Sequence, residues 1–315
     1  EQPRVGQETG WRERARRAES VGRGQGGVVS RRQLADLGIN GDQVRSMVRA
    51  GRWVHSGRHT LLVDGRRAEG LGRLWQAVWE SGSGAALHGA AAVVAHGVTG
   101  LTLDRIDVVV PRSTTRHPQP LPPGVRLHRP RRSPGLFPVG IARVRPETAM
   151  VAAAQWARSD REAVLMLCLP LQQRLVAPTR VAAAWATVER GPRRRLLDAV
   201  VRDLTDGARS LGELDFGRMV RSVGLPPPTR QMVRQGPDGR DYLDAAWEQI
   251  GLVAEIDGGH HLLALNPIED ALRQNDVVIG GEVVLRIPVV GLRLCPAAFL
   301  AQLVRAHRAL SARAA

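Results

Sequence analysis

The sequence predicts an α+β protein made of several domains. At 315 residues, the chain is long enough for two or three separate cores. Short β-prone runs bounded by Gly and Pro alternate with longer segments of helical periodicity. Hydrophobic residues make up 43%, an ordinary share for a folded chain, so the composition excludes wholesale disorder.

Residues 1–75 are predicted to form a small helical domain. Ser30 and Gln33 have the spacing of a capping box, and the helix that they open ends at Gly38. A second short helix follows in "NGDQVRSMVRAG", so the turn "GIN" joins two helices as in a helix-turn-helix. Two β-prone runs in "RWVHSGRHTLLVDG" then predict a hairpin, which would be the wing of a winged helix.

Arginines gather on the elements of this segment that would meet a DNA groove. They are Arg31, Arg32, Arg45, Arg49, Arg52 and Arg58. DNA binding is therefore the expected role of residues 1–75, and the alternative is a three-helix domain with no nucleic-acid role.

Residues 76–207 are expected to form an α/β linking domain. The runs "RIDVVVPRS", "GVRLHRP" and "IARVRP" predict short strands separated by Pro-rich turns. From Thr148 to about Arg209 the pattern is helical. His88, His96 and His128 are scattered through this region, and we expect a structural role for each.

Residues 208–315 predict a third domain in the order helix, strand, strand, helix, strand, helix. The second helix is expected to open near Asn266 and to close at Gly280, and Pro296 is expected to open the last one. This order is typical of a layered domain of about a hundred residues.

The two predicted strands of this domain carry a group of acids. Alternation along "LVAEID" places Glu255 and Asp257 on one face of their strand. A hairpin centred near Gln249 would place Asp244 opposite a residue close to Glu255. Carboxylates this close repel one another unless a cation neutralises them, and oxygen-only ligation suits Mg²⁺ or Mn²⁺.

The string "YLDAAW…LVAEIDGGHH…DALR…GGEVVLRIP" closely resembles the Vsr-like domain, which is related to very-short-patch-repair endonucleases of the PD-(D/E)XK superfamily. The resemblance covers roughly residues 208–315 and implies a restriction-endonuclease-like α/β core with a four-stranded mixed sheet. It implies that Asp244 and Glu255 bind metal. Asp257 stands where the general pattern has lysine, His261 matches the histidine after "DGG", and Glu213 matches an acid on the first helix.

The departure from the lysine pattern leaves several roles open. The chain has no lysine, so Asp257 is expected to bind metal or act as a base, with His261 as the second candidate. Glu213 is as well explained as a helix cap. Arg273 either pairs with Asp270 on a helix or contacts a phosphate. The rival view of the whole domain is a nuclease fold whose chemistry has lapsed.

Arg286 lies in the middle of an apolar strand, "EVVLRI". We expect it to be buried there, and a buried arginine needs a partner. A site carboxylate or a DNA phosphate would serve.

The N-terminal string "GVVSRRQLADLGINGDQVRSMVRAGRWV" resembles the winged-helix domain of AbiEi-type antitoxins of type IV toxin–antitoxin systems. Its wing departs from that family, because "GRHTLL" stands where an aromatic residue is usual. The resemblance implies a DNA-binding repressor, with a cognate toxin or a homodimer as the protein partner.

The charge distribution agrees with a nucleic-acid partner. The formal net charge is +15, and all 45 basic residues are arginine. Residues 1–75 hold 15 arginines against 8 acids, and residues 76–210 hold 19 against 10, whereas residues 211–315 hold 11 against 12. The excess of arginine therefore lies outside the acidic segment, where it can neutralise phosphates. RNA is the weaker candidate, since one Tyr and three Phe offer few stacking platforms.

The remaining features predict a protein of a reducing compartment that is not attached to a membrane. The two cysteines, Cys168 and Cys295, lie far apart in apolar contexts, which argues against a disulfide framework or a zinc cluster. No apolar run is long enough to span a bilayer, and no amphipathic anchor accompanies the basic residues. We therefore expect a cytoplasmic, metal-dependent DNA endonuclease or nickase. The alternative is a non-catalytic transcriptional regulator of antitoxin type with an inactive nuclease-like domain.

Overall fold

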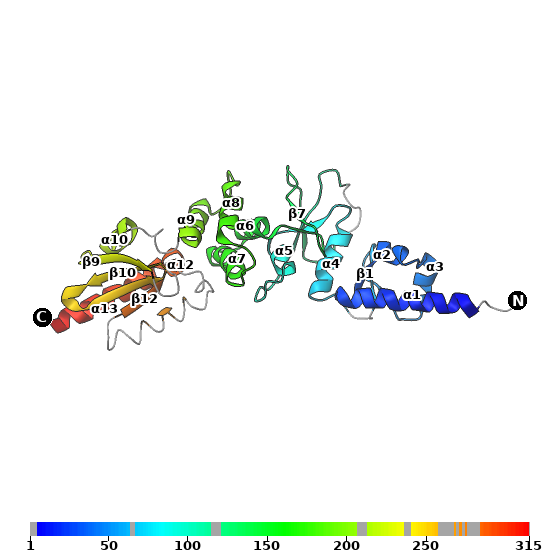
Figure 1. Cartoon of the computed structure of the whole chain (residues 1–315), viewed down its shortest axis with the longest axis horizontal. Coiled ribbons are helices and arrows are strands. Elements are labelled where there is room, and N and C mark those ends of the chain that lie inside the picture. The colour runs from blue at the N-terminus through cyan, green and yellow to red at the C-terminus, as the bar shows by residue number, and fades with distance from the viewer. Residues whose placement is uncertain are drawn as a thin grey trace. The chain divides into compact units, whose positions relative to one another are not determined.

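The computed structural model describes most of the chain, in two compact units. The described residues are 5–63, 67–114, 121–206, 213–235, 241–257, 284–314 and the single positions 268, 271, 272 and 275. The first unit is Glu1–Ala149 and the second is Met150–Ala315. Both units combine helices with β-sheet, so the predicted mixed α/β, multidomain class is confirmed (Figure 1).

The first unit begins with a long helix, a strand, two short helices and a β-hairpin. These elements are α1 (Val5–Gly24), β1 (Val28–Ser30), α2 (Arg31–Asp36), α3 (Gly41–Arg49), β2 (Val54–His55) and β3 (Thr60–Leu62). The three strands form an antiparallel sheet in the order β1-β3-β2, so the hairpin closes back on the strand that precedes the helices. Leu34, Met47, Trp53 and Leu61 are buried together in the core of this part.

Capping boxes fix the starts of both short helices. Ser30 Oγ accepts a hydrogen bond from the Gln33 amide at 3.1 Å, and Gln33 Oε1 accepts one from the Ser30 amide at 3.0 Å, which confirms the predicted box. Asn40 and Gln43 form a second box with two bonds of 3.0 Å, which the sequence analysis did not identify. Gly38 lies between the helices at φ +73°, a left-handed conformation that favours glycine.

The rest of the first unit is a five-stranded sheet with two helices packed on it. Its elements are α4 (Leu71–Glu80), β4 (Ala86–Leu87), α5 (Gly89–Ala95), β5 (Ile106–Val109), β6 (Val125–His128), β7 (Leu136–Phe137) and β8 (Arg143–Val144). The strand order is β6-β5-β4-β8-β7, with parallel pairs β5–β6 and β4–β8. The predicted strands are β5, β6 and β8, whereas β4 and β7 are additional.

Helix α4 packs against both sheets of the first unit. It packs against β1 and β3 of the first sheet and against β4 and β5 of the second. The predicted boundary between residues 75 and 76 lies within this helix.

The second unit begins with a group of helices, as the pattern from Thr148 onward predicts. They are α6 (Pro146–Trp156), which starts in the first unit, and α7 (Asp160–Gln172), α8 (Pro178–Ala186) and α9 (Arg194–Asp206). Helix α9 packs against α7, α8 and the later helix α12 (Val289–Leu294). Between α9 and α12, Arg293 Nε lies 3.1 Å from Asp203 Oδ2 and Arg293 Nη2 lies 3.3 Å from Oδ1, so both ends of the carboxylate are bound.

A four-stranded mixed sheet follows, of the kind that the Vsr-like resemblance implies. Its elements are α10 (Glu213–Ser222), β9 (Arg230–Gln235), β10 (Asp241–Trp247), the 3₁₀ turn η2 (Glu248–Ile250), β11 (Leu252–Asp257), β12 (Val284–Pro288), α12 and α13 (Pro296–Ala314). The order is β12-β11-β10-β9; β11 and β12 are parallel, and the other pairs are antiparallel. The helix expected over 266–280 lies mostly outside the described residues, but the four described positions between 268 and 275 are helical.

The two faces of this sheet differ. Leu252, Ala254 and Ile256 of β11 are fully buried, as alternation predicts, and α13 packs against that strand. The opposite face carries Glu255, whose side chain is 25% exposed, and Arg286, whose side chain is 68% exposed. The face predicted to hold the acids is therefore the more open one at these positions.

Candidate functional site

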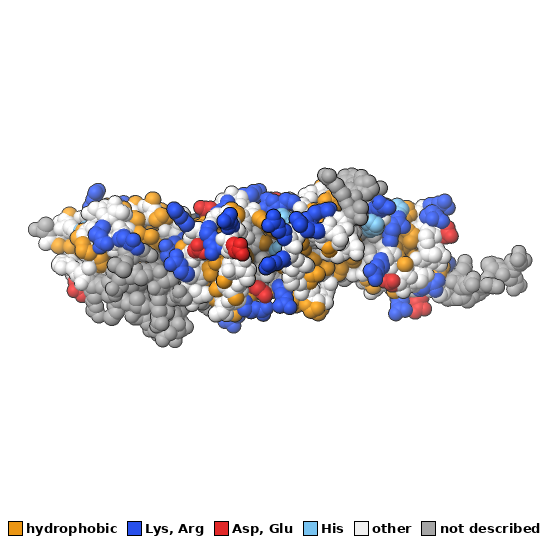
Figure 2. All heavy atoms as spheres, turned by 90° about the horizontal axis from the view of Figure 1, so that it is seen from above, with side chains coloured by type: hydrophobic (Ala, Val, Ile, Leu, Met, Phe, Trp, Pro, Cys, Tyr) orange, Lys and Arg blue, Asp and Glu red, His pale blue; other side chains and the backbone are white. Residues whose placement is uncertain are grey.

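The six arginines predicted to contact DNA all lie on the surface of the first unit. Arg31 and Arg32 open α2, Arg45 and Arg49 lie on α3, Arg52 follows α3, and Arg58 lies in the β2–β3 turn; all six are exposed. Val44 and Met47 are buried on the other side of α3. Helix α3 therefore turns an apolar face to the core and an arginine face to solvent. Figure 2 shows arginine side chains distributed widely over the visible surface, with fewer acids among them.

Several of these arginines already have internal contacts. Arg45 forms an ion pair with Asp42 one turn earlier. Arg52 Nη2 lies 3.4 Å from Glu19 Oε1 on α1, and the Trp53 indole N–H donates to the same oxygen at 3.4 Å. These are exposed or half-exposed pairs, which stabilise a fold by less than about 1 kcal/mol each.

The β2–β3 turn is held by the shared helix α4. The Glu80 carboxylate accepts hydrogen bonds from the amides of Arg58 (3.1 Å) and His59 (2.8 Å). It also accepts one from Thr60 Oγ1 at 2.7 Å. A Cβ on Gly57 would lie 2.3 Å from Glu80 Oε1, so any larger residue there would shift the Glu80 carboxylate away from these hydrogen bonds. Gln76 Nε2 adds a hydrogen bond of 2.7 Å to Ser56 Oγ. These contacts, which no pattern in the sequence indicated, fix the hairpin tip.

The strand register of the C-terminal sheet brings two predicted metal ligands to one position. Asp244 of β10 pairs directly with Glu255 of β11, and Arg286 of β12 pairs with Glu255 from the other side. Residues opposite one another in neighbouring strands project to the same face of a sheet, with Cβ atoms about 4.5–5.5 Å apart. Asp257 follows Glu255 by two positions, so it belongs to the same face by alternation.

The ion pair at this position joins Arg286 Nε and Glu255 Oε2 at 3.6 Å. Arg286 therefore has a carboxylate partner, Glu255, which is one of the acids predicted to bind metal. The expected burial was wrong, because the Arg286 side chain is 68% exposed. The apolar neighbours of Arg286 misled the prediction: Leu285 and Ile287 point to the covered face, and Arg286 alternates to the other face.

The remaining predicted site residues fall outside the description of the structure. The side chains of Asp244, Asp257 and Glu213 are not described, and His261 and Arg273 lie wholly outside the described residues. Among the side chains that are described, no group of three His, Cys, Asp or Glu residues has the spacing of a metal site. The Mg²⁺ or Mn²⁺ site over Asp244, Glu255 and Asp257 stays a prediction.

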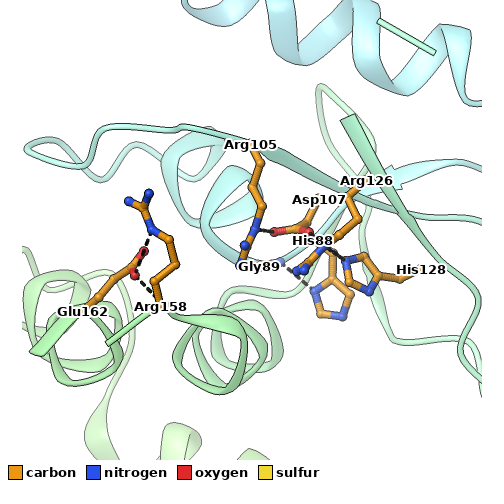
Figure 3. Close-up of polar contacts among 8 residues, drawn as sticks. All are labelled: His88, Gly89, Arg105, Asp107, Arg126, His128, Arg158 and Glu162. Carbon is orange, nitrogen blue, oxygen red and sulfur yellow. Dashed lines mark hydrogen bonds and ion pairs between the residues drawn. The ribbon is translucent and has the colours of Figure 1, made fainter. Parts of the chain in front are cut away.

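A buried polar cluster in the five-stranded sheet was missed by the sequence analysis. Asp107 is 3% exposed, and its Oδ1 accepts hydrogen bonds from Arg126 Nε at 2.6 Å and His128 Nε2 at 2.7 Å (Figure 3). Arg105 Nε lies 3.5 Å from the other oxygen. The parallel register pairs Asp107 with Arg126 and brings His128 two positions further along the same strand. The cluster ties β5 to β6, so the expected structural role of His128 agrees with its contacts.

His88 lies beside this cluster and caps α5. Its Nδ1 accepts a hydrogen bond from the Gly89 amide at 2.8 Å. Burial, and then the nearby His128, lower the pKa of His88 to about 4, so the ring is neutral at pH 7. Burial alone would raise the pKa of Asp107, but the hydrogen bonds from His128 and Arg126 outweigh it and hold that pKa below its usual range.

Comparison with known proteins adds no family to this picture: no protein-family model matches the chain, and no curated protein matches it. Across the described residues, no helix has both the length and the apolar character needed to cross a bilayer.

Proposed function

We propose that residues 5–63 form a winged-helix domain that binds duplex DNA, as in AbiEi-type antitoxins. The supporting observation is the order helix, strand, helix, helix, hairpin, with Arg45 and Arg49 on the exposed face of α3. In winged helices the second helix of the helix-turn-helix enters the major groove. Helix α3 has that position in the order of elements, and its arginines lie opposite the buried Val44 and Met47.

The flanking arginines suit the DNA backbone. Arg31 and Arg32 lie at the start of α2, and Arg58 lies at the tip of the hairpin, which is the predicted wing. Arginine binds phosphate oxygens through paired N–H groups. Such contacts carry no sequence information, but they position the recognition helix and make binding dependent on salt.

Fluorescence anisotropy with a labelled duplex tests this function. Arg49→Ala should weaken binding, and the slope of log K against log[salt] should fall by about 1 for each DNA phosphate that the variant no longer binds. Arg308→Ala removes an exposed arginine from α13 and is the matched control for net charge. Equal binding by these two variants, or no duplex binding by the unaltered chain, would contradict the proposal.

We also propose that residues 208–315 are a metal-dependent endonuclease or nickase domain of the PD-(D/E)XK superfamily, similar to the Vsr-like domain. The observation that favours it is the direct pairing of Asp244 with Glu255 on the open face of a mixed sheet. Carboxylate oxygens on neighbouring strands are a donor set that fits Mg²⁺ or Mn²⁺. The metal, when bound, would stabilise negative charge on a phosphodiester and lower the pKa of a water molecule.

The other predicted site residues would have supporting roles. In the proposed site, Asp257 and Glu213 would add carboxylates, and His261 would assist proton transfer. Arg286 balances part of the charge of Glu255, and its exposed guanidinium could instead bind a DNA phosphate. Arg273 would contact a neighbouring phosphate.

Nicking of supercoiled plasmid in Mg²⁺ or Mn²⁺ tests the nuclease proposal. Asp244→Ala and Glu255→Ala should each abolish nicking, whereas Glu248→Ala, an exposed acid in the turn between the same two strands, should leave it unchanged. Nicking that survives both changes would not depend on Asp244 or Glu255 and would contradict the proposed site. Absence of nicking by the unaltered chain, together with duplex binding, would favour the rival function: a DNA-binding regulator of antitoxin type, with a toxin or a second copy as its partner.

A further inference from the structure

A pocket lies beside the predicted wing in the first unit. It has a volume of about 590 Å³, within the range of roughly 300–1,000 Å³ that is usual for small-molecule sites. Its walls come from the start of α2, the β2–β3 turn, one side of α4 and the segment 121–123. The lining residues are Arg31, His55, Ser56, Gly57, Arg58, Gln76, Glu80, Leu121, Pro122 and Pro123.

One wall of this pocket is cationic and held in place. Arg31 Nε donates to the Arg58 carbonyl at 2.9 Å, and Arg31 Nη2 donates to His55 Nδ1 at 3.3 Å. These contacts fix Arg31 and leave its Nη1 available. Among the described residues, no acid forms an ion pair with Arg31 or Arg58.

The single acid of the pocket offsets only one of the two arginine charges. Glu80 accepts from the amides of Arg58 and His59 and from Thr60 Oγ1, so its carboxylate is bound to the hairpin and forms no ion pair with either arginine. Two guanidinium groups therefore line a concave surface without a carboxylate partner among the described residues. Such a surface binds phosphate or carboxylate anions.

Another part of the lining is apolar. Leu121, Pro122 and Pro123 contribute hydrocarbon surface to the same pocket. Small-molecule sites combine apolar walls with a few placed polar groups that fix orientation. A ligand with a phosphate at one end and a flat ring at the other would match both walls.

We infer that this pocket binds a nucleotide, with the phosphate on Arg31 and Arg58 and the base against Leu121–Pro123. Because Arg31 and Arg58 are also the proposed phosphate contacts of the wing, a bound nucleotide competes with duplex DNA. The competition rests on the proposed DNA binding, whereas the nucleotide site does not. The nucleotide comes either from solution or from a nucleic-acid strand that enters the pocket.

Titration of the full chain with a fluorescent AMP derivative tests the site, with inorganic phosphate and adenosine as separate probes. AMP should bind more tightly than inorganic phosphate alone or adenosine alone. Arg58→Ala should weaken AMP binding by about tenfold or more, and Arg58→Lys should retain part of the affinity. Arg17→Ala is the matched control for charge: Arg17 is exposed on α1 and does not line the pocket, so AMP binding should not change. Circular dichroism checks that each variant is folded.

A labelled duplex and a labelled single strand distinguish the sources of the nucleotide. Displacement of the duplex by AMP supports the inference, and so does binding of AMP in a chain that fails to bind duplex, although the proposed DNA function then falls. Unsaturable AMP titration, or equal AMP affinity in the unaltered chain and Arg58→Ala, overturns the nucleotide site even if duplex binding persists. Duplex binding that saturating AMP leaves unchanged overturns the competition. A single strand that competes with AMP through Arg58 identifies the strand as the source.

Discussion

The side-chain amide of Asn275 binds both backbone groups of Arg286. Asn275 Oδ1 accepts from the Arg286 amide at 3.0 Å, and Asn275 Nδ2 donates to the Arg286 carbonyl at 3.0 Å. Strand β12 is at the edge of its sheet, so these groups would otherwise lack a strand neighbour. Asn275 also donates to Gln302 of α13 at 3.1 Å. One amide thus holds the strand position whose side chain pairs with Glu255.

Replacement of Asn275 should destabilise this edge. Asn275 is 2% exposed, so Asn275→Ala leaves the partly buried backbone groups of Arg286 without their partner and should cost ~1–3 kcal/mol. Hydrogen exchange of the Arg286 amide measures the effect locally and should accelerate. Gln249→Ala, at an exposed amide in η2, is the control. Unchanged exchange in Asn275→Ala would show that the amide does not hold the strand.

The hairpin tip should depend on Glu80. Glu80→Ala removes the acceptor of two backbone amides and of Thr60 Oγ1, and we expect a loss of ~1–3 kcal/mol. Exchange of the Arg58 and His59 amides should accelerate, and duplex DNA binding should weaken with it. Glu69→Ala is the control for charge, since Glu69 is exposed just before α4. Protection of both amides in Glu80→Ala would refute the role of this carboxylate.

His88 should make the first unit sensitive to acid. Its pKa falls on folding from the ordinary 6.5 to about 4, so the folded state disfavours the protonated ring. Stability is therefore full above about pH 6.5 and declines as pH falls toward 4, by ~3 kcal/mol in total. The pKa of Asp107 is also lowered on folding, so its contribution is lost only at still lower pH, below its ordinary 3.8.

Melting temperature as a function of pH measures the effect of His88. His88→Asn preserves an acceptor for the Gly89 amide and should flatten the decline between pH 6.5 and 4. Part of the decline should persist, because burial also lowers the pKa of His96. Identical pH profiles for the two chains would exclude His88 as the cause.

Replacing one partner of the ion pair between α9 and α12 should destabilise the protein more than replacing both partners with apolar residues. The side chains of Asp203 and Arg293 are 4% and 17% exposed. Asp203→Leu should cost roughly 3–5 kcal/mol, because Arg293 keeps a buried charge, and Arg293→Met should cost a similar amount, because Asp203 keeps one. The double change Asp203→Leu with Arg293→Met should cost less than either single change. Urea unfolding compares the three variants, and additive losses would show that the two side chains do not interact.

Local signals predicted local structure well. Ser30 and Gln33 form the capping box that their spacing indicates, and alternation identified the buried and open faces of β11. Strand β9 was missed, because an edge strand of mostly polar residues after a Pro-rich turn resembles a loop. The box of Asn40 and Gln43 had the same signal and could have been found.

Contacts between distant segments were harder to predict. Asp107 meets Arg126 and His128 only because β5 and β6 are parallel, and nothing in either strand encodes that register. The pairing of Asp244 with Glu255 was accessible, because a short antiparallel hairpin fixes its own register from its turn. Glu80 and the hairpin tip are likewise far apart in sequence, and no local pattern joins them.

Because α4 packs against both sheets of the first unit, it limits where a shorter fragment of the chain can end. A fragment that stops at residue 75 would cut the helix midway, discard Gln76 and Glu80, and remove half of a helix that packs against both sheets. A fragment carried through Ser81 retains both anchors of the hairpin tip. Excision of the first arginine-rich segment for spectroscopy or crystallisation should therefore end beyond this helix.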